Sequence, residues 1–205
     1  AGAIPSHLVR RIVTLELPFH SRSVLARAVR NARRYLKHAS PLVDRFTGFE
    51  SHIEEALRGR RYDLAVVEHF WCAPYCELLR KYCDRVVMDL HNIESVLLAR
   101  CGKVEKFPRS AVFRRFARAT RRLEHRLLPC FSALLVSSDH DAVEIRKVAP
   151  YTKVIVYPNA VPPSPPLETQ QHDDAIVFSG NLEYEPNRSA VTYFQQRIWP
   201  LLKQR

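Results

Sequence analysis

The sequence predicts an α/β fold in which a parallel sheet is flanked by helices. Short apolar runs rich in β-branched residues alternate with amphipathic segments of helical periodicity. The clearest runs are 62–67 (YDLAVV) and 86–90 (VVMDL), separated by a helical segment over about 74–83. A strand, a helix and a strand in this spacing form a βαβ unit with parallel strands and a right-handed crossover. The run at 86–90 is typical of a strand that is buried on both faces.

Further elements extend this pattern in both directions. The run 11–17 (RIVTLEL) predicts a first strand, and a basic amphipathic helix from Ser21 or Ser23 to about His38 follows it. The apolar side of that helix carries Val24, Leu25, Ala28, Val29 and Leu36. The other predicted elements are a helix over about 46–58, helices over 94–100 and about 108–128, and strands at 133–136 and 153–157.

The C-terminal part of the sequence predicts a linker and a second domain. Residues 161–173 (VPPSPPLETQQHD) contain four prolines and no periodicity, which is typical of a linker. A strand at 175–179 and a helix over about 187–203 then form one βα unit, which cannot build a core alone. We therefore expect domains at 1–160 and 174–205, the second incomplete and the first lacking its opening βα unit.

The composition favours a globular protein with an anionic partner. The chain is 46% hydrophobic and 26% charged, and its net charge is +11. Nucleic acid, an anionic membrane surface or a phosphorylated substrate would each suit this charge. No apolar run approaches the roughly 18 residues of a membrane span, and the N-terminus has no secretory signal. Five cysteines without a C-x-x-C pair favour a reduced cytoplasmic protein without a metal site.

Polar residues follow three of the predicted strands at the point where each strand ends. Ligands of open α/β sheets bind in the crevice outside the carboxyl ends of the strands, so this edge is the predicted site. The residues are Glu68 and His69 after the run 62–67, His91, Asn92 and Glu94 after the run 86–90, and Ser137, Ser138 and Asp139 after the run 133–136.

A purely structural interpretation of the same residues remains open. Asn92 or Ser95 would cap the helix that follows, and the helix dipole would favour Glu94 in its first turn. Ser138 or Asp139 would cap the next helix in the same way, although free N–H groups there could also bind an anion.

The order of the motifs resembles the GT-B glycosyltransferases of family four, in particular those of polysaccharide and exosortase-associated systems. The motif PNAV at 158–161 resembles the family's PNGVD, from which it departs at Ala160 and Pro162. The segment GNLEYEPN at 180–187, followed by IWP at 198–200, resembles the family's opening of the donor domain. In this family two Rossmann-like domains face each other across a cleft, with the acceptor domain first and the donor domain second.

The resemblance implies retaining transfer of a sugar from a nucleotide-diphosphate donor to a glycan or lipid-linked acceptor, without a metal or other cofactor. His91 would be the catalytic cleft histidine, and Gly180 would let the backbone approach the donor phosphates. The family's paired glutamates, E-x7-E, would lie beyond Arg205, so the 205 residues alone are expected to be inactive. The other candidate substrate- and donor-binding residues are Asn92, Glu94, Glu68, His69, Ser138, Asp139, Asn181, Tyr184 and Asn187.

The helix over 108–128 carries dense positive charge. Between residues 100 and 126 there are ten Lys or Arg residues against Glu105 and Glu124 only. A solvated face is the plain interpretation, and docking to anionic lipid at the inner face of the cell membrane is the functional one. The candidate docking residues are Arg114, Arg115, Arg118, Arg121 and Arg122.

Two other classes compete with the glycosyltransferase hypothesis. A non-catalytic basic module for nucleic acid or membranes would explain the charge, although no recognised nucleic-acid-binding motif is present. A dinucleotide-dependent or P-loop enzyme is disfavoured, because the sequence contains neither G-x-G-x-x-G nor G-x-x-x-x-G-K-[ST].

Overall fold

The fold is described from a computed structural model of the 205-residue chain. It describes residues 9–19, 21, 23–41, 43–160, 175–182 and 185–203. The chain divides into two compact units, 1–160 and 161–205, which we treat separately. The predicted linker at 161–173 lies outside the described residues.

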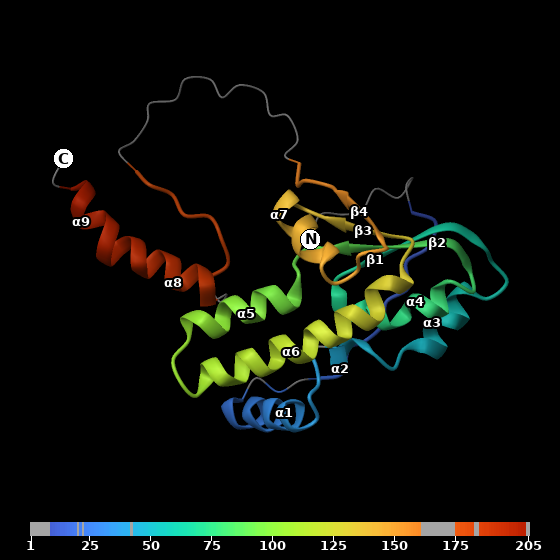
Figure 1. Cartoon of the computed structure of the whole chain (residues 1–205), viewed down its shortest axis with the longest axis horizontal. Coiled ribbons are helices and arrows are strands. Elements are labelled where there is room, and N and C mark those ends of the chain that lie inside the picture. Colours follow the sequence, from blue (N-terminus) through green and yellow to red (C-terminus); the bar gives the residue numbers. More distant parts are fainter. Residues whose placement is uncertain are drawn as a thin grey trace, which may run out of the picture. The chain divides into compact units, whose positions relative to one another are not determined.

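The first unit is built on a four-stranded, wholly parallel sheet with the strand order β1-β2-β3-β4 (Figure 1). Met88 of β2 lies between Val67 of β1 and Leu134 of β3, and Leu134 in turn pairs with Val154 of β4. This arrangement confirms the predicted α/β fold and is Rossmann-like. The strands are β1 (Tyr62–Glu68), β2 (Cys83–Leu90), β3 (Ala133–Val136) and β4 (Lys153–Val156).

Helices connect each pair of strands and precede the sheet. Before the sheet lie α1 (Val24–Leu36), α2 (Val43–Phe46) and α3 (Glu50–Leu57). Between β1 and β2 lie the 3₁₀ helix η1 (Phe70–Tyr75) and α4 (Cys76–Leu79), where the sequence predicted a single helix. Between β2 and β3 lie α5 (Glu94–Val104), α6 (Arg109–Leu127) and the short η2 (Leu128–Cys130), and α7 (Asp139–Arg146) leads to β4.

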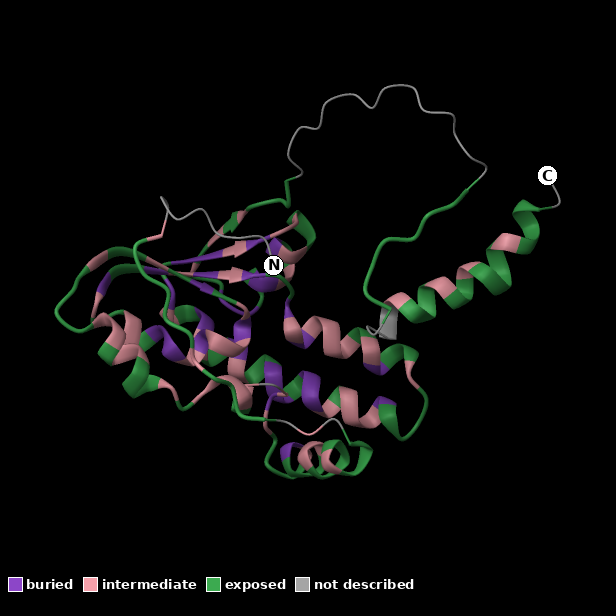
Figure 2. Ribbon diagram, turned by 180° about the vertical axis from the view of Figure 1, so that it is seen from behind, coloured by how far each residue is buried: buried purple, intermediate pink, exposed green. Residues whose placement is uncertain are grey.

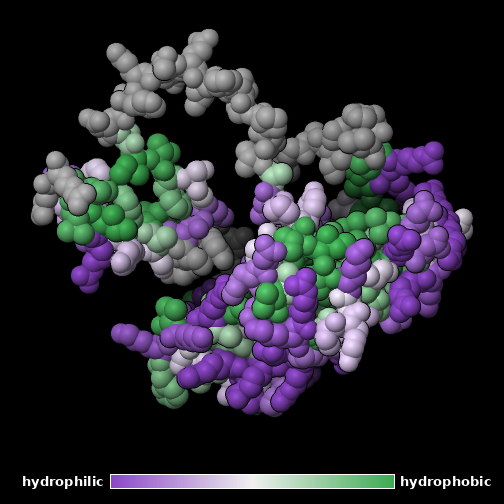
Figure 3. Space-filling view, turned by 45° about the horizontal axis from the view of Figure 1, so that its top comes forward, coloured by the Kyte–Doolittle hydropathy of each residue, from purple (hydrophilic) through white to green (hydrophobic). Residues whose placement is uncertain are grey.

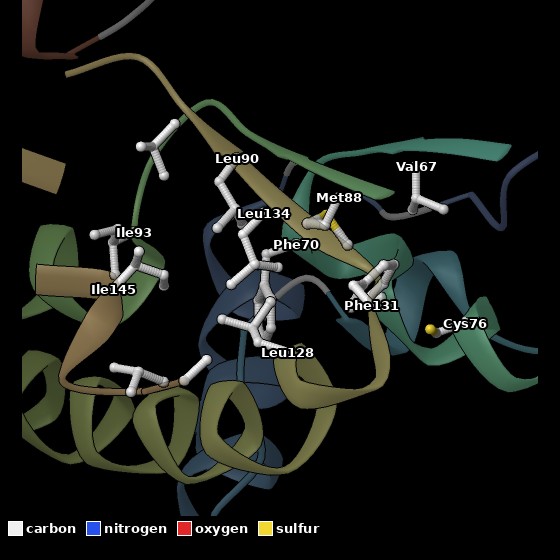
Figure 4. Close-up of a cluster of buried hydrophobic side chains, with 14 of the residues drawn as sticks. Val67, Phe70, Cys76, Met88, Leu90, Ile93, Leu128, Phe131, Leu134 and Ile145 are labelled. Carbon is white, nitrogen blue, oxygen red and sulfur yellow. The ribbon is translucent and has the colours of Figure 1, made fainter. Parts of the chain in front are cut away.

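The core lies on one face of the sheet, which corrects the prediction that 86–90 is buried on both faces. Val86, Met88 and Leu90 are at most 3% exposed, whereas Val87 between them is half-buried. Met88 and Leu90 lie in one buried cluster with Leu128 and Ile145, which come from the connecting helices (Figure 4). The physical reason is the sequential strand order, because successive right-handed crossovers in one direction place every connecting helix on the same face.

The opposite face of the sheet is apolar and more exposed. Leu64 and Val66 of β1 are 52% and 55% exposed, and Ile155 of β4 is 38% exposed. Hydrophobic side chains gather on the sheet side of this unit, bordered by hydrophilic ones (Figure 3). The β-branched composition of the strands therefore reflects their pleated packing more than burial on both sides.

Two predicted strands do not form. Residues 11–17 form no regular secondary structure and lie outside the sheet, and Ile12 is 69% exposed. Among the described residues no backbone hydrogen bond joins this segment to β1. Residues 175–179 of the second unit also form no strand. An apolar run needs a neighbouring strand to complete its hydrogen bonds, and neither segment pairs with a strand in the part of the chain that the structure describes.

The apolar side of α1 faces solvent, while its polar side packs. Leu25 and Leu36 are 77% and 74% exposed, whereas Arg34 is 9% exposed and donates to both carboxylate oxygens of Asp44 at 3.1 and 2.6 Å. On α6, Arg115 Nε donates to the Tyr35 carbonyl at 2.9 Å, and its guanidinium carbon lies 4.2 Å from the centre of the Tyr35 ring. Polar contacts therefore join α1 to α2 through Arg34 and to α6 through Arg115.

The helices α5 and α6 lie side by side over their lengths (Figures 1 and 2). Gly102 of α5 is buried, and a Cβ atom on it would meet Arg114 Cγ of α6 at 3.0 Å and the Arg114 backbone nitrogen at 3.3 Å. A side chain at this position would press on Arg114, so glycine suits this close approach. None of the described helices combines the length and the apolarity that a membrane span requires.

The second unit consists of a short helical segment. It contains α8 (Glu185–Tyr193), a π-helical turn η3 (Phe194–Ile198) and α9 (Trp199–Leu202). The predicted helix at 187–203 therefore forms, but with a π turn in its middle.

Replacing a side chain on the covered face of the sheet should cost far more stability than replacing one on the open face. We expect Met88→Ala to lower the free energy of unfolding by about 2–5 kcal/mol, because Met88 is fully buried. Val66→Ala on the neighbouring strand should cost less than about 1 kcal/mol, because Val66 is half exposed. Urea unfolding of both variants measures the difference, and equal losses would contradict a one-sided core.

Candidate functional site

The carboxyl ends of β1 and β2 bring Glu68, His69 and His91 together. In the parallel register Glu68, the last residue of β1, pairs with Asp89 near the end of β2. His69 and His91, which directly follow the two strands, therefore lie at the same edge of the sheet. One ligand atom from each of the three side chains lies within 4.8 Å of the other two. The two imidazole rings stack with their centres 4.4 Å apart. The sequence predicted that these residues share one crevice, and the geometry brings them into contact.

His69 is held in an unusual position. Its φ of 65° lies in the left-handed region that a histidine rarely adopts, and its N–H donates to the Asp89 carbonyl at 3.2 Å. Its ring stacks on Trp71 on one side, with centres 4.6 Å apart, and on His91 on the other. Such backbone strain is concentrated at functional sites, so the fold holds His69 where a relaxed loop would not.

Burial lowers the pKa of His69, and the nearby His91 lowers it further because two adjacent imidazolium charges repel. Neutral imidazoles can hydrogen-bond a substrate hydroxyl or ligate a metal. With the Glu68 carboxylate, the two histidines offer a donor set that divalent transition metals such as zinc accept. That the protein acts without a metal stays a prediction. The Glu68–His69–His91 cluster is the place at which metal binding would test it.

The start of α5 is organised by a carboxylate from α6. Glu124 is 1% exposed, and its Oε1 accepts a hydrogen bond from the Ser95 N–H at 2.9 Å. Its other carboxylate oxygen has no hydrogen-bond partner in the described part of the chain. Glu124 therefore caps α5 from another helix. No local sequence signal marks it, because it lies in a run of arginines.

Glu94 lies at the first position of α5 beside Glu124. Burial, and then the repulsion of Glu124, raise the pKa of Glu94 to about 7. Burial also raises the pKa of Glu124, partly opposed by its hydrogen bonds to Ser95. A carboxyl group that titrates near neutral pH at the carboxyl edge of a sheet can exchange a proton with a bound ligand.

The structure decides between the capping alternatives. Ile93 occupies the N-cap of α5 and makes no side-chain bond, so neither Asn92 nor Ser95 caps this helix, and Asn92 is exposed. Ser138 does cap α7, because its hydroxyl accepts from the Asp141 N–H at 3.2 Å and donates to Asp141 Oδ2 at 2.7 Å. Asp139 is the exposed first residue of α7.

The predicted donor-side residues lie in the second unit. Gly180 is exposed, and a Cβ atom on it would meet Asn187 Nδ2 and the Phe178 ring, each at 3.0 Å. Asn187 donates to the Asn181 carbonyl at 3.1 Å, which closes the loop before α8. Tyr184 lies outside the described residues. A side chain on Gly180 would therefore require the side chains of Asn187 and Phe178 to shift. The predicted contact of Gly180 with donor phosphates stays a prediction.

The five arginines predicted to dock on a membrane do not share one face of α6. Arg115 is engaged with α1 through Tyr35 and donates to His38 Nε2 at 2.6 Å. Arg122 lines a hollow beside α2. Arg114, Arg118 and Arg121 line a different hollow between α5 and α7. Membrane docking by the whole set stays a prediction.

Comparison with protein-family models, with curated proteins and with solved structures yields no match.

Titration of Glu94 should make the fold less stable as the pH rises. Its pKa is raised from the usual 4.5 to about 7, so the fold favours the protonated form. The stabilisation that protonated Glu94 contributes to the free energy of unfolding is fully present below pH 4.5. It is lost as the pH rises from 4.5 through about 7, and the loss is on the order of 2 kcal/mol. Urea unfolding at intervals across this range measures the decrease.

Glu94→Gln should reduce this decrease, because glutamine does not titrate. Glu55→Gln on the exposed side of α3 is the matched control and should leave the decrease unchanged. If Glu94→Gln shows the same pH dependence as the wild type, Glu94 is not the group responsible.

Proposed function

We propose that this chain is the acceptor-side domain of a glycosyltransferase, together with the beginning of its donor-binding domain. The protein would transfer a sugar from a nucleotide-diphosphate donor to a glycan or lipid-linked acceptor, with retention of configuration, in polysaccharide or glycoconjugate synthesis. The observation that carries the proposal is the Glu68–His69–His91 cluster at the carboxyl edge of a parallel sheet. The order of the sequence motifs supports it.

The reaction needs groups that hold a sugar and accept or release a proton. It breaks the bond between the anomeric carbon and the donor diphosphate, forms a bond to an acceptor oxygen, and releases a nucleoside diphosphate and a proton. His91 is exposed at the edge and would hydrogen-bond the transferred sugar. His69, stacked beneath it, acts as a positioning residue for the His91 ring. Asn92 and Glu68 are exposed at the same edge and would contact hydroxyl groups.

The electrostatics of the chain suit this chemistry. Nucleotide diphosphates and lipid-linked phosphates are anionic, and the net charge of +11 would attract both. We place the protein in the cytoplasm, at the inner face of the membrane where a lipid-linked acceptor would be presented. Peripheral attachment through basic residues needs no helix that inserts into the bilayer.

A non-catalytic basic module is the second candidate, and the exposed arginines of α6 favour it. Two results together would support this candidate. The protein would bind a random oligonucleotide with an affinity that falls steeply with salt concentration, as expected when several phosphates are neutralised, and it would consume no nucleotide sugar.

A glycosyl-transfer assay on the full gene product tests the proposed function. We expect release of nucleoside diphosphate from one of a panel of nucleotide sugars, dependent on an acceptor extract. His91→Ala should lower the turnover number by about 100-fold or more, because a positioned hydrogen-bonding or proton-transfer group is lost. The exposed His125→Ala on α6 is the matched control and should retain full turnover.

Equal turnover of His91→Ala and wild type would remove His91 from the site. Absence of turnover with every nucleotide sugar would count against the glycosyltransferase assignment itself. Thermal unfolding of both variants should match the wild type, because both histidines are exposed.

A further inference from the structure

A hollow between α5, α6 and α7 concentrates positive charge. Its volume is about 550 Å³, within the range of pockets that hold small ligands. We call it the basic pocket and define it by its cationic and histidine side chains, which are Arg100, Lys103, Arg114, Arg118, Arg121 and His140.

The positive charge of the basic pocket is not balanced by ion pairs. Within the described part of the chain none of its Arg or Lys side chains forms a salt bridge. The one acidic lining residue, Glu144, already binds Lys147 Nζ at 2.6 Å. The buried Glu124 lies nearby and its carboxylate is directed to the Ser95 N–H. The pocket therefore holds five Arg or Lys side chains against the single carboxylate of Glu144.

The side chains come from helices that the fold holds together firmly. Gly102 of α5 lies close against Arg114 of α6, and its neighbour Lys103 lines the pocket together with Arg114. Arg100 Nη2 lies 2.9 Å from His140 Nε2, which links α5 to the first turn of α7. Because arginine can only donate, the histidine nitrogen accepts this bond, and the Arg100 charge stays uncompensated.

We propose that the basic pocket binds a multivalent phosphate group, such as the diphosphate of an activated or lipid-linked sugar or the headgroup of an anionic lipid. Arginine guanidinium groups bind phosphate oxygens through paired, charge-assisted hydrogen bonds, and Lys103 adds a point charge. A diphosphate with an attached group fits the volume of the pocket. The site depends on these three helices alone and does not require that the protein transfer a sugar.

The arginines of α6 that line the basic pocket are arranged differently from arginines on a flat membrane-docking face. Arg114, Arg118 and Arg121 follow one another at spacings of four and three residues, so they share one side of α6. That side faces a hollow with walls from two other helices, which surrounds a ligand on several sides.

Titration calorimetry of the full chain with inorganic pyrophosphate tests the site. At about 0.1 M salt, where distant charges are screened, we expect saturable binding that Arg118→Gln/Arg121→Gln weakens about tenfold or more. Both residues are exposed, so the fold should be retained. A second pair, Lys103→Gln/Arg118→Gln, should give the same loss from a different wall of the pocket.

The matched control is Arg58→Gln/Arg146→Gln. It removes the same two charges from exposed positions that line no part of the pocket, and it should change the affinity less than about twofold. Equal weakening by the pocket pairs and the control pair would mean that net charge alone attracts pyrophosphate. That result, or absence of binding by the wild type, would overturn the proposal.

Vesicle sedimentation distinguishes the two sources of the phosphate. If vesicles that contain phosphatidic acid, whose headgroup is a phosphate monoester, bind the wild type and the control pair but not the pocket pairs, the ligand is a lipid headgroup. If pyrophosphate binding depends on the pocket while vesicle binding does not, the ligand is the diphosphate of a soluble or activated sugar. A third outcome is that a random oligonucleotide binds tightly through the pocket while pyrophosphate binds weakly. This outcome would overturn both the lipid headgroup and the sugar diphosphate as ligands and would assign the pocket to nucleic acid.

Discussion

The sequential order of four parallel strands is the constraint on which the rest of the first unit depends. Crossovers between parallel strands are right-handed as a rule, and here each new strand is added on the same side of the last, so the connecting helices fall on one face. The same order places the carboxyl ends of β1 and β2 side by side. It therefore fixes which side chains are buried, as at Met88, and where polar residues meet, as at His69 and His91.

The sequence was sufficient to predict the features that strand pairing determines. The apolar runs at β1 to β4 and the helices between them were identified from periodicity, and parallel pairing brought Glu68, His69 and His91 to one edge. The left-handed backbone of His69 and its stacking between Trp71 and His91 were not predictable, because they depend on side chains from η1 and from the neighbouring strand.

The features that the sequence failed to predict depend on contacts between distant segments. Residues 11–17 have the composition of a strand, but among the described residues no backbone hydrogen bond joins them to the free edge of β1, and composition alone does not specify such pairing. The sequence did not distinguish a strand buried on one face from a strand buried on both, because either can carry a β-branched run such as 86–90. Glu124 lies among arginines, yet it is buried, and its carboxylate accepts the N–H of Ser95 in the first turn of another helix.

The positive charge of α6 illustrates how packing converts composition into a site. A row of arginines on one helix favours a flat anionic surface when it is considered alone. In the fold, Arg115 is held against α1 by the Tyr35 carbonyl and ring, while Arg118 and Arg121 join Arg100 and Lys103 around a hollow. Charges that surround a ligand contact more of its oxygens than charges beneath it do, so a discrete phosphate gains more from this geometry than an extended surface does.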